Sequence, residues 1–380
     1  LALAGTGNFA PDPSGRKPVV LSGIVLNSPL LDYNTAYSQG DGSFAGTLPT
    51  YAMMADYYQK GAIRGTASTD EFLNKLRKFA DEDYQRARNV KYPPKREKFL
   101  KTSKEQLGVV KGYFTDSPAD AKKWASDKAL LDAYIKGWGG SLADDQSIRD
   151  RLIKEFLVDP VAALEWIVKE NESGGADRWK NFTMSDPGIR FTEELTRLTG
   201  IVANWAQEFE MPWYVVKERA LPGLDFNNYD ARLSIPKGAY DITFYEDESF
   251  KKAINTVLKD TFDFHSKTAY LTSNMDLLPK IWDYNREASR SYAKSSIPDL
   301  VETLGYYPAL KILILHGYYD VVTTFHQTEL DLENVGLHTR IPVKSYEGGH
   351  MTYESEEARA PLKQDLDKFY TASDASGVAM

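Results

Sequence analysis

An aspartate and a histidine, thirty positions apart, are the side chains of this sequence best suited to carry chemistry. Asp320 ends the segment GYYD and His350 ends the segment GGH. Each follows an apolar run rich in β-branched residues, which predicts strands at 311–316 and 341–346. In an open parallel sheet, functional groups gather at the carboxyl ends of the strands. The spacing therefore predicts that Asp320 orients His350, which would act as a general acid and base.

The alternative is that Asp320 is a turn residue and His350 a surface residue, because aspartate and glycine are common in loops after strands. The two glycines before His350 permit a tight loop with unusual backbone angles. The other histidines are predicted to serve packing or the surface: His265, His316, His326 and His338.

The sequence predicts neither a metal site nor a cofactor. It contains no cysteine, which excludes a thiol nucleophile, a disulfide and a cysteine-based metal site. It also lacks the HExxH spacing of zinc enzymes, the GxGxxG fingerprint of dinucleotide-binding proteins and the phosphate-binding P-loop.

A nucleophilic serine is not evident. A nucleophile elbow requires G-x-S-x-G between a strand and a helix, and the chain has no such segment. The nearest match, Gly139–Ala143 (GGSLA), follows a predicted helix rather than a strand. Ser28 ends a predicted strand, but Pro29 after it has no backbone N–H to contribute to an oxyanion hole. Neither serine is predicted to be a nucleophile.

The predicted elements indicate an α/β protein with an insertion. A buried strand is predicted at 19–26, and strands alternate with helices again after about residue 297. Between them helix-period segments predominate, such as 70–86 with a possible N-cap at Thr69. The pattern predicts a core formed by 1–61 and 291–380, with a helical cap at 62–290.

Composition narrows the class of protein. The chain has 380 residues and a formal net charge of −8, so the basic field of a nucleic-acid-binding protein is missing. The locally basic stretch 95–104 is interleaved with glutamate and is interpreted as a solvated helix face. No apolar run approaches the roughly 18 residues that a membrane span requires. Neither nucleic acid nor membrane is predicted as a partner.

The first residues suggest the end of a helix. Leu1–Ala4 are strong helix formers, and Gly5 fits a helix C-cap. There is no initiator methionine, charged segment or signal-length apolar core. We therefore expect the chain to be a fragment or a processed product.

Several segments together resemble the serine carboxypeptidase family, particularly its bacterial, cysteine-poor branch. The matching segments, in the family's order, are 23–32 (GIVLNSPLLD), 48–52 (LPTYA), 229–233 (YDARL), 282–285 (WDYN), 317–320 (GYYD) with Thr323, and 346–353 (YEGGHMTY). They cover nearly the whole chain, and 317–353 is the specific part.

The resemblance implies an α/β-hydrolase, a mostly parallel sheet with a large inserted helical cap, that removes the C-terminal residue of a peptide through an acyl-enzyme. It implies that Asp320 and His350 are the triad's aspartate and histidine and that Met351 lines the pocket for the departing residue. The family's serine lies in a Gly-Glu-Ser-Tyr-Gly motif, upstream of the region that this chain matches. Secreted or periplasmic location is implied by the family alone.

From this resemblance we expect a missing N-terminal segment, or a separate chain of the same protein, to supply the serine. The chain alone is then predicted to be inactive, since removal of a triad member leaves only about 10³–10⁴-fold catalysis over water. Two alternatives stay open: an acyltransferase or lyase on the same fold, or a binding protein that has lost its nucleophile.

Overall fold

The structure is a computed structural model that describes part of the chain. The described residues are 22–39, 42–60, 64–91, 154, 158–159, 161–163, 165, 177–239, 244–268, 270–272, 274, 277, 281 and 295–371. The predicted loop Gly139–Ala143 and the basic stretch 95–104 lie outside them.

The chain forms two compact units. The first contains described residues of 1–80, 196–203 and 210–380, and the second those of 81–195 and 204–209. The second unit thus lies within the predicted cap, whereas 62–80 and 210–290 group with the first unit. The limits of the cap at 62 and 290 stay a prediction.

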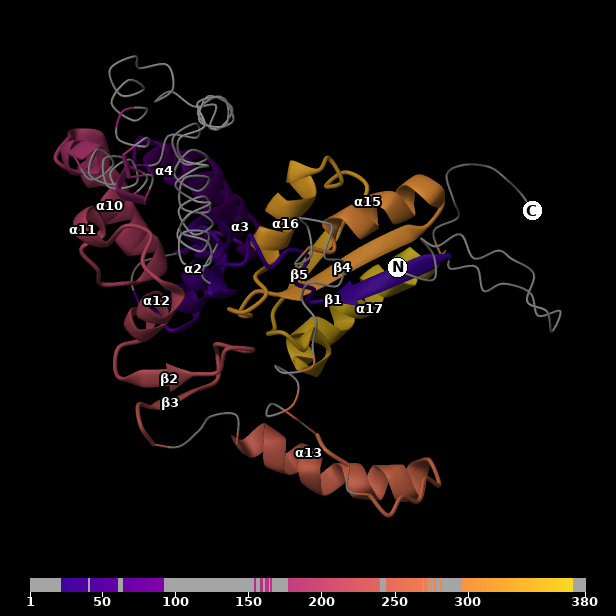
Figure 1. The fold of residues 1–380 in the computed structure, drawn as a ribbon. Coiled ribbons are helices and arrows are strands. Elements are labelled where there is room, and N and C mark those ends of the chain that lie inside the picture. Colours follow the sequence, from indigo (N-terminus) through magenta and orange to yellow (C-terminus); the bar gives the residue numbers. More distant parts are fainter. Residues whose placement is uncertain are drawn as a thin grey trace. The chain divides into compact units, whose positions relative to one another are not determined.

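A parallel three-stranded sheet forms the centre of the first unit, so the fold is mixed α/β as predicted. The strands β1 (Gly23–Asn27), β4 (Lys311–Gly317) and β5 (Val343–Tyr346) are arranged in the order β1-β4-β5. Both strand pairs are parallel, so all three carboxyl ends lie at the same edge (Figure 1).

Helices cover both faces of this sheet, which explains the nearly continuous apolar sequence of β4. Ile312 and Ile314 pack in one cluster with residues of α15 (Ile297–Tyr306) and α16 (Phe325–Asn334). Leu313 and Leu315 pack against α17 (Glu356–Thr371) in another. Burial of each such side chain contributes about 1.5–3 kcal/mol.

The other described helices and turns of the first unit are α2 (Leu48–Tyr57), α3 (Thr69–Lys78), α12 (Trp213–Ala220), α13 (Phe244–Thr256), and the short turns η1 (Tyr37–Gln39), η2 (Phe44–Gly46), η4 (Val257–Thr261) and η5 (Thr352–Glu354). The predicted N-cap Thr69 is wrong by one residue. Ser68 caps α3 in a capping box, accepting from the N–H of Glu71 while the Glu71 carboxylate accepts from the Ser68 N–H.

A short antiparallel hairpin was not expected within the helix-rich region. Its strands are β2 (Leu224–Phe226) and β3 (Ser234–Pro236). The residues between them, Asn227–Leu233, are called the hairpin loop below.

An ion pair joins two helices of the first unit that are far apart in the sequence. Arg77 of α3 donates two hydrogen bonds of 2.8 Å to Glu329 of α16, and His326 lies 2.8 Å from the same carboxylate. The pKa of Glu329 falls to about 2 because hydrogen bonds from His326 and Arg77 outweigh the desolvation that burial imposes. This geometry fixes α3 against α16.

The second unit contains most of η3 (Phe79–Tyr84), a π-helical turn that begins in the first unit and leads into α4 (Gln85–Lys91). It also contains α11 (Trp205–Glu208) and most of α10 (Asp186–Thr199), whose last four residues group with the first unit. Aromatic side chains are prominent among the buried residues that the structure describes in this unit. Trp179 and Phe209 stack with their ring centroids 4.2 Å apart, and Tyr84 and Phe191 pack around Phe209.

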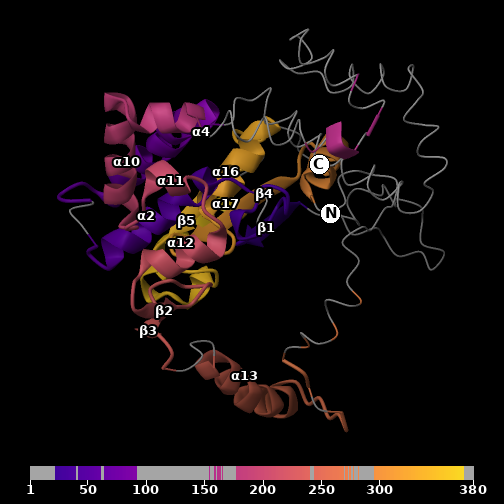
Figure 2. The ribbon, with the colours of Figure 1, turned by 60° about the vertical axis from the view of Figure 1, so that its left-hand side comes forward.

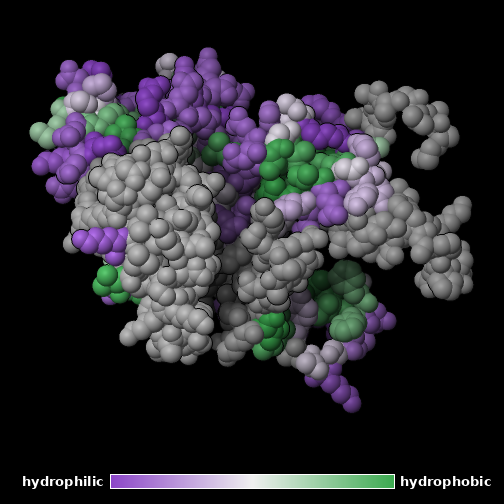
Figure 3. All heavy atoms as spheres, turned by 45° about the horizontal axis from the view of Figure 1, so that its top comes forward, coloured by the Kyte–Doolittle hydropathy of each residue, from purple (hydrophilic) through white to green (hydrophobic). Residues whose placement is uncertain are grey.

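Among the residues coloured in Figure 3, hydrophilic ones predominate, and apolar residues form smaller green areas. Within the described part of the chain, no helix combines the length and apolar character that crossing a bilayer demands.

Candidate active site

The structure brings the two predicted residues, Asp320 and His350, into contact. Gly317, the last residue of β4, pairs with Tyr346, the last residue of β5, so the loops that follow leave the sheet side by side. Nδ1 of His350 lies 2.7 Å from Oδ2 of Asp320. The Asp320 side chain is fully buried, whereas 31% of the His350 side chain is exposed. One group is thus shielded from water while the other is accessible to a reactant.

Asp320 is held by a full set of donors. Its Oδ1 accepts from the N–H groups of Val322 and Thr323, at 2.9 and 3.1 Å. Its Oδ2 accepts from the Thr323 hydroxyl at 2.6 Å and from His350 Nδ1. A carboxylate only accepts hydrogen bonds, so Nδ1 of His350 carries the proton. Nε2 is then left with the lone pair that a general base requires.

Glycines allow the backbones at this edge to approach closely. A Cβ on Gly317 would lie 2.1 Å from the carbonyl oxygen of Gly349. A Cβ on Gly349 would lie 2.3 Å from the carbonyl oxygen of Tyr229. These distances are too short for any side chain, so the segments GYYD and GGH require glycine at both positions.

The hairpin loop completes the site, and sequence reasoning did not place it there. Figure 2 shows the hairpin beside the loops that follow β4 and β5. Three main-chain hydrogen bonds join them: His350 N–H to Tyr229 O at 2.6 Å, Ala231 N–H to Tyr319 O at 3.0 Å, and Val321 N–H to Asn228 O at 3.1 Å. The one available signal was the segment YDARL, which contributed to the family resemblance without a role.

Ser28 contacts the histidine loop through a hydrogen bond to its main chain. Its hydroxyl donates to the carbonyl oxygen of His350 at 2.6 Å, and the Asn27 amide donates to the same oxygen at 2.8 Å. Ser28 is buried and has a positive φ of 46°, a conformation uncommon for residues other than glycine. The hydroxyl proton of Ser28 is therefore bound to the main chain, not to Nε2 of His350.

Met351, the predicted substrate-binding residue, directly follows His350 and precedes η5. Its side chain is partly buried. The structure thus places Met351 next to the histidine, and its role in binding stays a prediction.

The remaining histidines lie apart from this pair. His316 is fully buried in β4 with Nε2 2.9 Å from the Thr328 hydroxyl. Burial lowers the pKa of His316 to about 4, so it is neutral at pH 7. His326 is buried against Glu329, while His265 and His338 are exposed. These positions agree with the packing and surface roles predicted for them.

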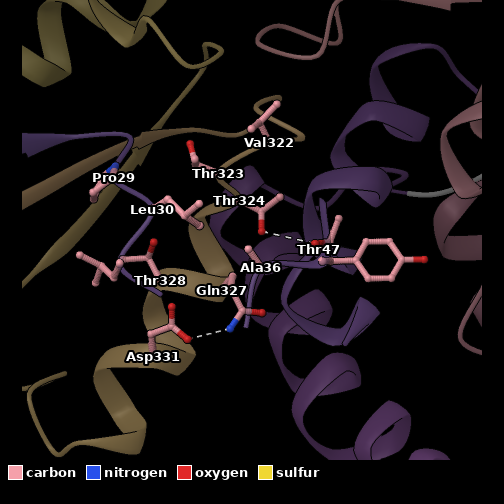
Figure 4. A pocket seen from close by; sticks show the side chains of 12 residues that line it. Pro29, Leu30, Ala36, Thr47, Val322, Thr323, Thr324, Gln327, Thr328 and Asp331 are labelled. Carbon is pink, nitrogen blue, oxygen red and sulfur yellow. Dashed lines mark hydrogen bonds between the residues drawn. The ribbon is translucent and has the colours of Figure 1, made fainter. Parts of the chain in front are cut away.

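A small pocket has Thr323 among its lining residues. It is lined by Pro29–Leu31, Ala36–Tyr37, Thr47, Val322–Thr324, Gln327–Thr328 and Asp331, several of which are shown in Figure 4. With a volume of about 10 Å³ it has room for a single water molecule. It is too small for a peptide substrate.

Asp331 in this pocket is expected to reduce stability at neutral pH. Burial, with a smaller contribution from Asp32, raises the pKa of Asp331 from 3.8 to about 6. Below pH 3.8 this carboxyl is neutral in both the folded and the unfolded protein, and it does not reduce stability. As the pH rises through 6 the buried carboxyl ionises, which lowers the free energy of unfolding by on the order of 3 kcal/mol at pH 7. Asp331→Asn keeps an acceptor for the Gln327 amide, which donates at 2.8 Å, and removes the charge.

Urea unfolding should therefore show Asp331→Asn to be more stable than the unsubstituted protein at pH 7, by about 3 kcal/mol, with little difference at pH 3.5. An equal effect at both pH values would show that the charge is not the cause.

No three histidine, aspartate or glutamate side chains lie close enough to hold a metal ion in the part of the chain that the structure describes. Comparisons of the chain with models of known protein families, with curated proteins and with solved structures found no match. The geometry of the Asp320–His350 pair is thus the principal basis for assigning a function.

Proposed function

We propose that the chain contributes the aspartate and the histidine of a Ser-His-Asp site in a serine carboxypeptidase of the α/β-hydrolase fold. The observation that carries the proposal is the contact between buried Asp320 and accessible His350, 2.7 Å apart at the carboxyl ends of adjacent parallel strands. The chain order, with aspartate before histidine, is the order of these two residues in the triad of the α/β-hydrolases.

In the proposed reaction, a serine hydroxyl attacks the last peptide carbonyl of the substrate and transfers its proton to Nε2 of His350. Asp320 stabilises the imidazolium that forms. His350 then donates this proton to the departing amine, which leaves an acyl-enzyme. Water, deprotonated by His350, attacks the acyl group and restores the serine. Met351 is proposed to contact the departing residue.

The serine is proposed to come from a part of the protein outside this chain, because the sequence has no G-x-S-x-G segment. Among the described strands, β1 has a partner on one side alone. A strand pairing in parallel with its free edge would end at the same sheet edge as Asp320 and His350. Such a position suits a nucleophile.

In line with the family resemblance, the protein is also proposed to be secreted or periplasmic.

A second candidate is a binding protein derived from such a hydrolase. It is favoured by one observation. Ser28, which contacts the histidine loop, donates its hydroxyl proton to the carbonyl oxygen of His350 and not to Nε2. This candidate and the enzyme differ in one measurable property, the presence of an activated serine.

A fluorophosphonate probe should label the protein purified from its natural source, because such probes react with serines activated by a neighbouring base. We expect mass spectrometry to locate the label on a serine outside residues 1–380, and we expect His350→Ala to abolish labelling while the fold is kept. Release of C-terminal residues from peptides identifies the carboxypeptidase. Absence of labelling would favour the binding protein, and transfer of an acyl group to an added alcohol would favour an acyltransferase.

A further inference from the structure

The ring of Tyr229 packs on the imidazole of His350. The two ring centroids are 5.1 Å apart and the ring planes are inclined by 55°. Tyr229 is 44% exposed, so burial of its own surface does not account for this position. The contact joins a residue of the hairpin loop to the proposed catalytic base, 121 positions later in the sequence.

The position of Tyr229 is fixed by its own loop. Oδ1 of buried Asn227 accepts from the N–H of Tyr229 at 2.7 Å, which closes a turn of the Asx type. Asp230 and Arg232 form a two-pronged ion pair with contacts of 3.0 and 2.7 Å. The Tyr58 hydroxyl donates to the carbonyl oxygens of Ala231 and Arg232, both at 2.9 Å.

The loop is also fixed to the aspartate side of the site. The Arg232 guanidinium lies 5.1 Å above the ring of Tyr319, a cation–π geometry. The Tyr319 hydroxyl donates to Glu347 at 2.6 Å, which lies three residues before His350. The hairpin loop is therefore attached to both loops that hold the Asp320–His350 pair.

The main chain of His350 is held on both sides, but its side chain is not. Its N–H donates to Tyr229 O, and its carbonyl oxygen accepts from Ser28 and Asn27. The imidazole is tethered through Nδ1, which lies 2.7 Å from Oδ2 of Asp320 and 3.1 Å from the Thr323 hydroxyl oxygen, and 31% of the side chain is exposed. Rotation about the side-chain bonds would break that tether and swing Nε2 away from a reactant. Tyr229 occupies a position on one side of the imidazole and opposes this rotation.

We propose that Tyr229 is a positioning residue, whose ring keeps the imidazole of His350 in the rotamer that bonds Asp320. This inference rests on the proposed function for its catalytic meaning and deepens it, because it adds the hairpin loop to the catalytic machinery. The proposal concerns the ring of Tyr229, since the main-chain contact of this residue persists in any substitution.

Nuclear magnetic resonance of the Nδ1 proton of His350 tests the proposal without any assay of hydrolysis. The full-length protein is labelled with ¹⁵N-histidine, and the signal is assigned by its loss in His350→Gln. In Tyr229→Leu we expect this proton to exchange with water about two- to tenfold faster, the range that loss of one aromatic contact implies. In Tyr229→Phe we expect the unsubstituted rate.

Tyr353→Leu is the matched control, because Tyr353 is an exposed tyrosine three residues after His350. In this variant the Nδ1 proton of His350 should exchange at the rate of the unsubstituted protein. Should Tyr229→Leu lower the melting temperature, Tyr229→Gln provides a second ring-free variant. Unchanged exchange in a folded ring-free variant would overturn the proposal, as would a change of equal size in Tyr229→Phe. Failure of the fluorophosphonate test would remove the proposed function and leave this result intact.

Discussion

Replacement of Asp320 by asparagine is expected to lower kcat for peptide hydrolysis by about 10⁴-fold while the fold is kept. The reason lies in the donors around the carboxylate. Oδ1 accepts from two N–H groups, so the introduced amide nitrogen cannot occupy that position without facing both of them. The NH₂ group must instead take the place of Oδ2.

At that place the NH₂ group meets Nδ1 of His350, which then has to accept a hydrogen bond. The imidazole proton moves to Nε2, the nitrogen that has to accept the proton of the serine. The variant would therefore hold its histidine in nearly the same position with the wrong tautomer, so the expected loss is in kcat more than in KM.

Steady-state kinetics on the full-length protein, with circular dichroism to check the fold, measure this effect. Asp367→Asn is the matched control. Asp367 is exposed on α17, and its carboxylate forms an ion pair with Lys363 on the same helix. It should leave kcat unchanged. If Asp320→Asn retained more than about a tenth of the activity, Asp320 would not be the residue that orients His350.

The contact between Asp320 and His350 could be predicted from the sequence because it follows from local patterns. The apolar runs before Asp320 and His350 are long enough to predict strands. A single rule, that the carboxyl ends of parallel strands share one edge, then brings the two side chains together. Neither step requires knowledge of contacts between distant segments.

The hairpin loop shows why the remainder of the site could not be predicted. Strands of three residues, such as Leu224–Phe226 and Ser234–Pro236, are too short for an alternating pattern to stand out. Its contacts with the histidine loop use main-chain atoms, which leave no trace in residue type apart from the glycine they require at 349. The pairing of Arg77 with Glu329, 252 positions apart, likewise depends on tertiary structure that no local pattern encodes.

The close approach of the hairpin loop to Gly349 leads to a second large expected effect. In Gly349→Ala, the new Cβ would lie 2.3 Å from the carbonyl oxygen of Tyr229 and 2.5 Å from Cβ of Asp230. Main-chain atoms cannot yield as a flexible side chain does, so the hairpin loop has to move away from His350. Overpacking of this kind costs about 1–3 kcal/mol and occasionally more. A displacement of about 1 Å at the histidine would lower kcat by about 10²-fold.

Gly348→Ala provides a matched control at the adjacent residue, because its Cβ would meet Cβ of Ser355 at 3.3 Å and needs a shift of a few tenths of an ångström. Hydrogen exchange measured by mass spectrometry should show loss of protection at the amides of Ala231, Val321 and His350 in Gly349→Ala, and near-normal protection in Gly348→Ala. Equal protection in the two variants would mean that the hairpin loop does not rest on the histidine loop. In that case Tyr229 could not hold the imidazole, whereas the pairing of His350 with Asp320, which depends on β4 and β5, would stand.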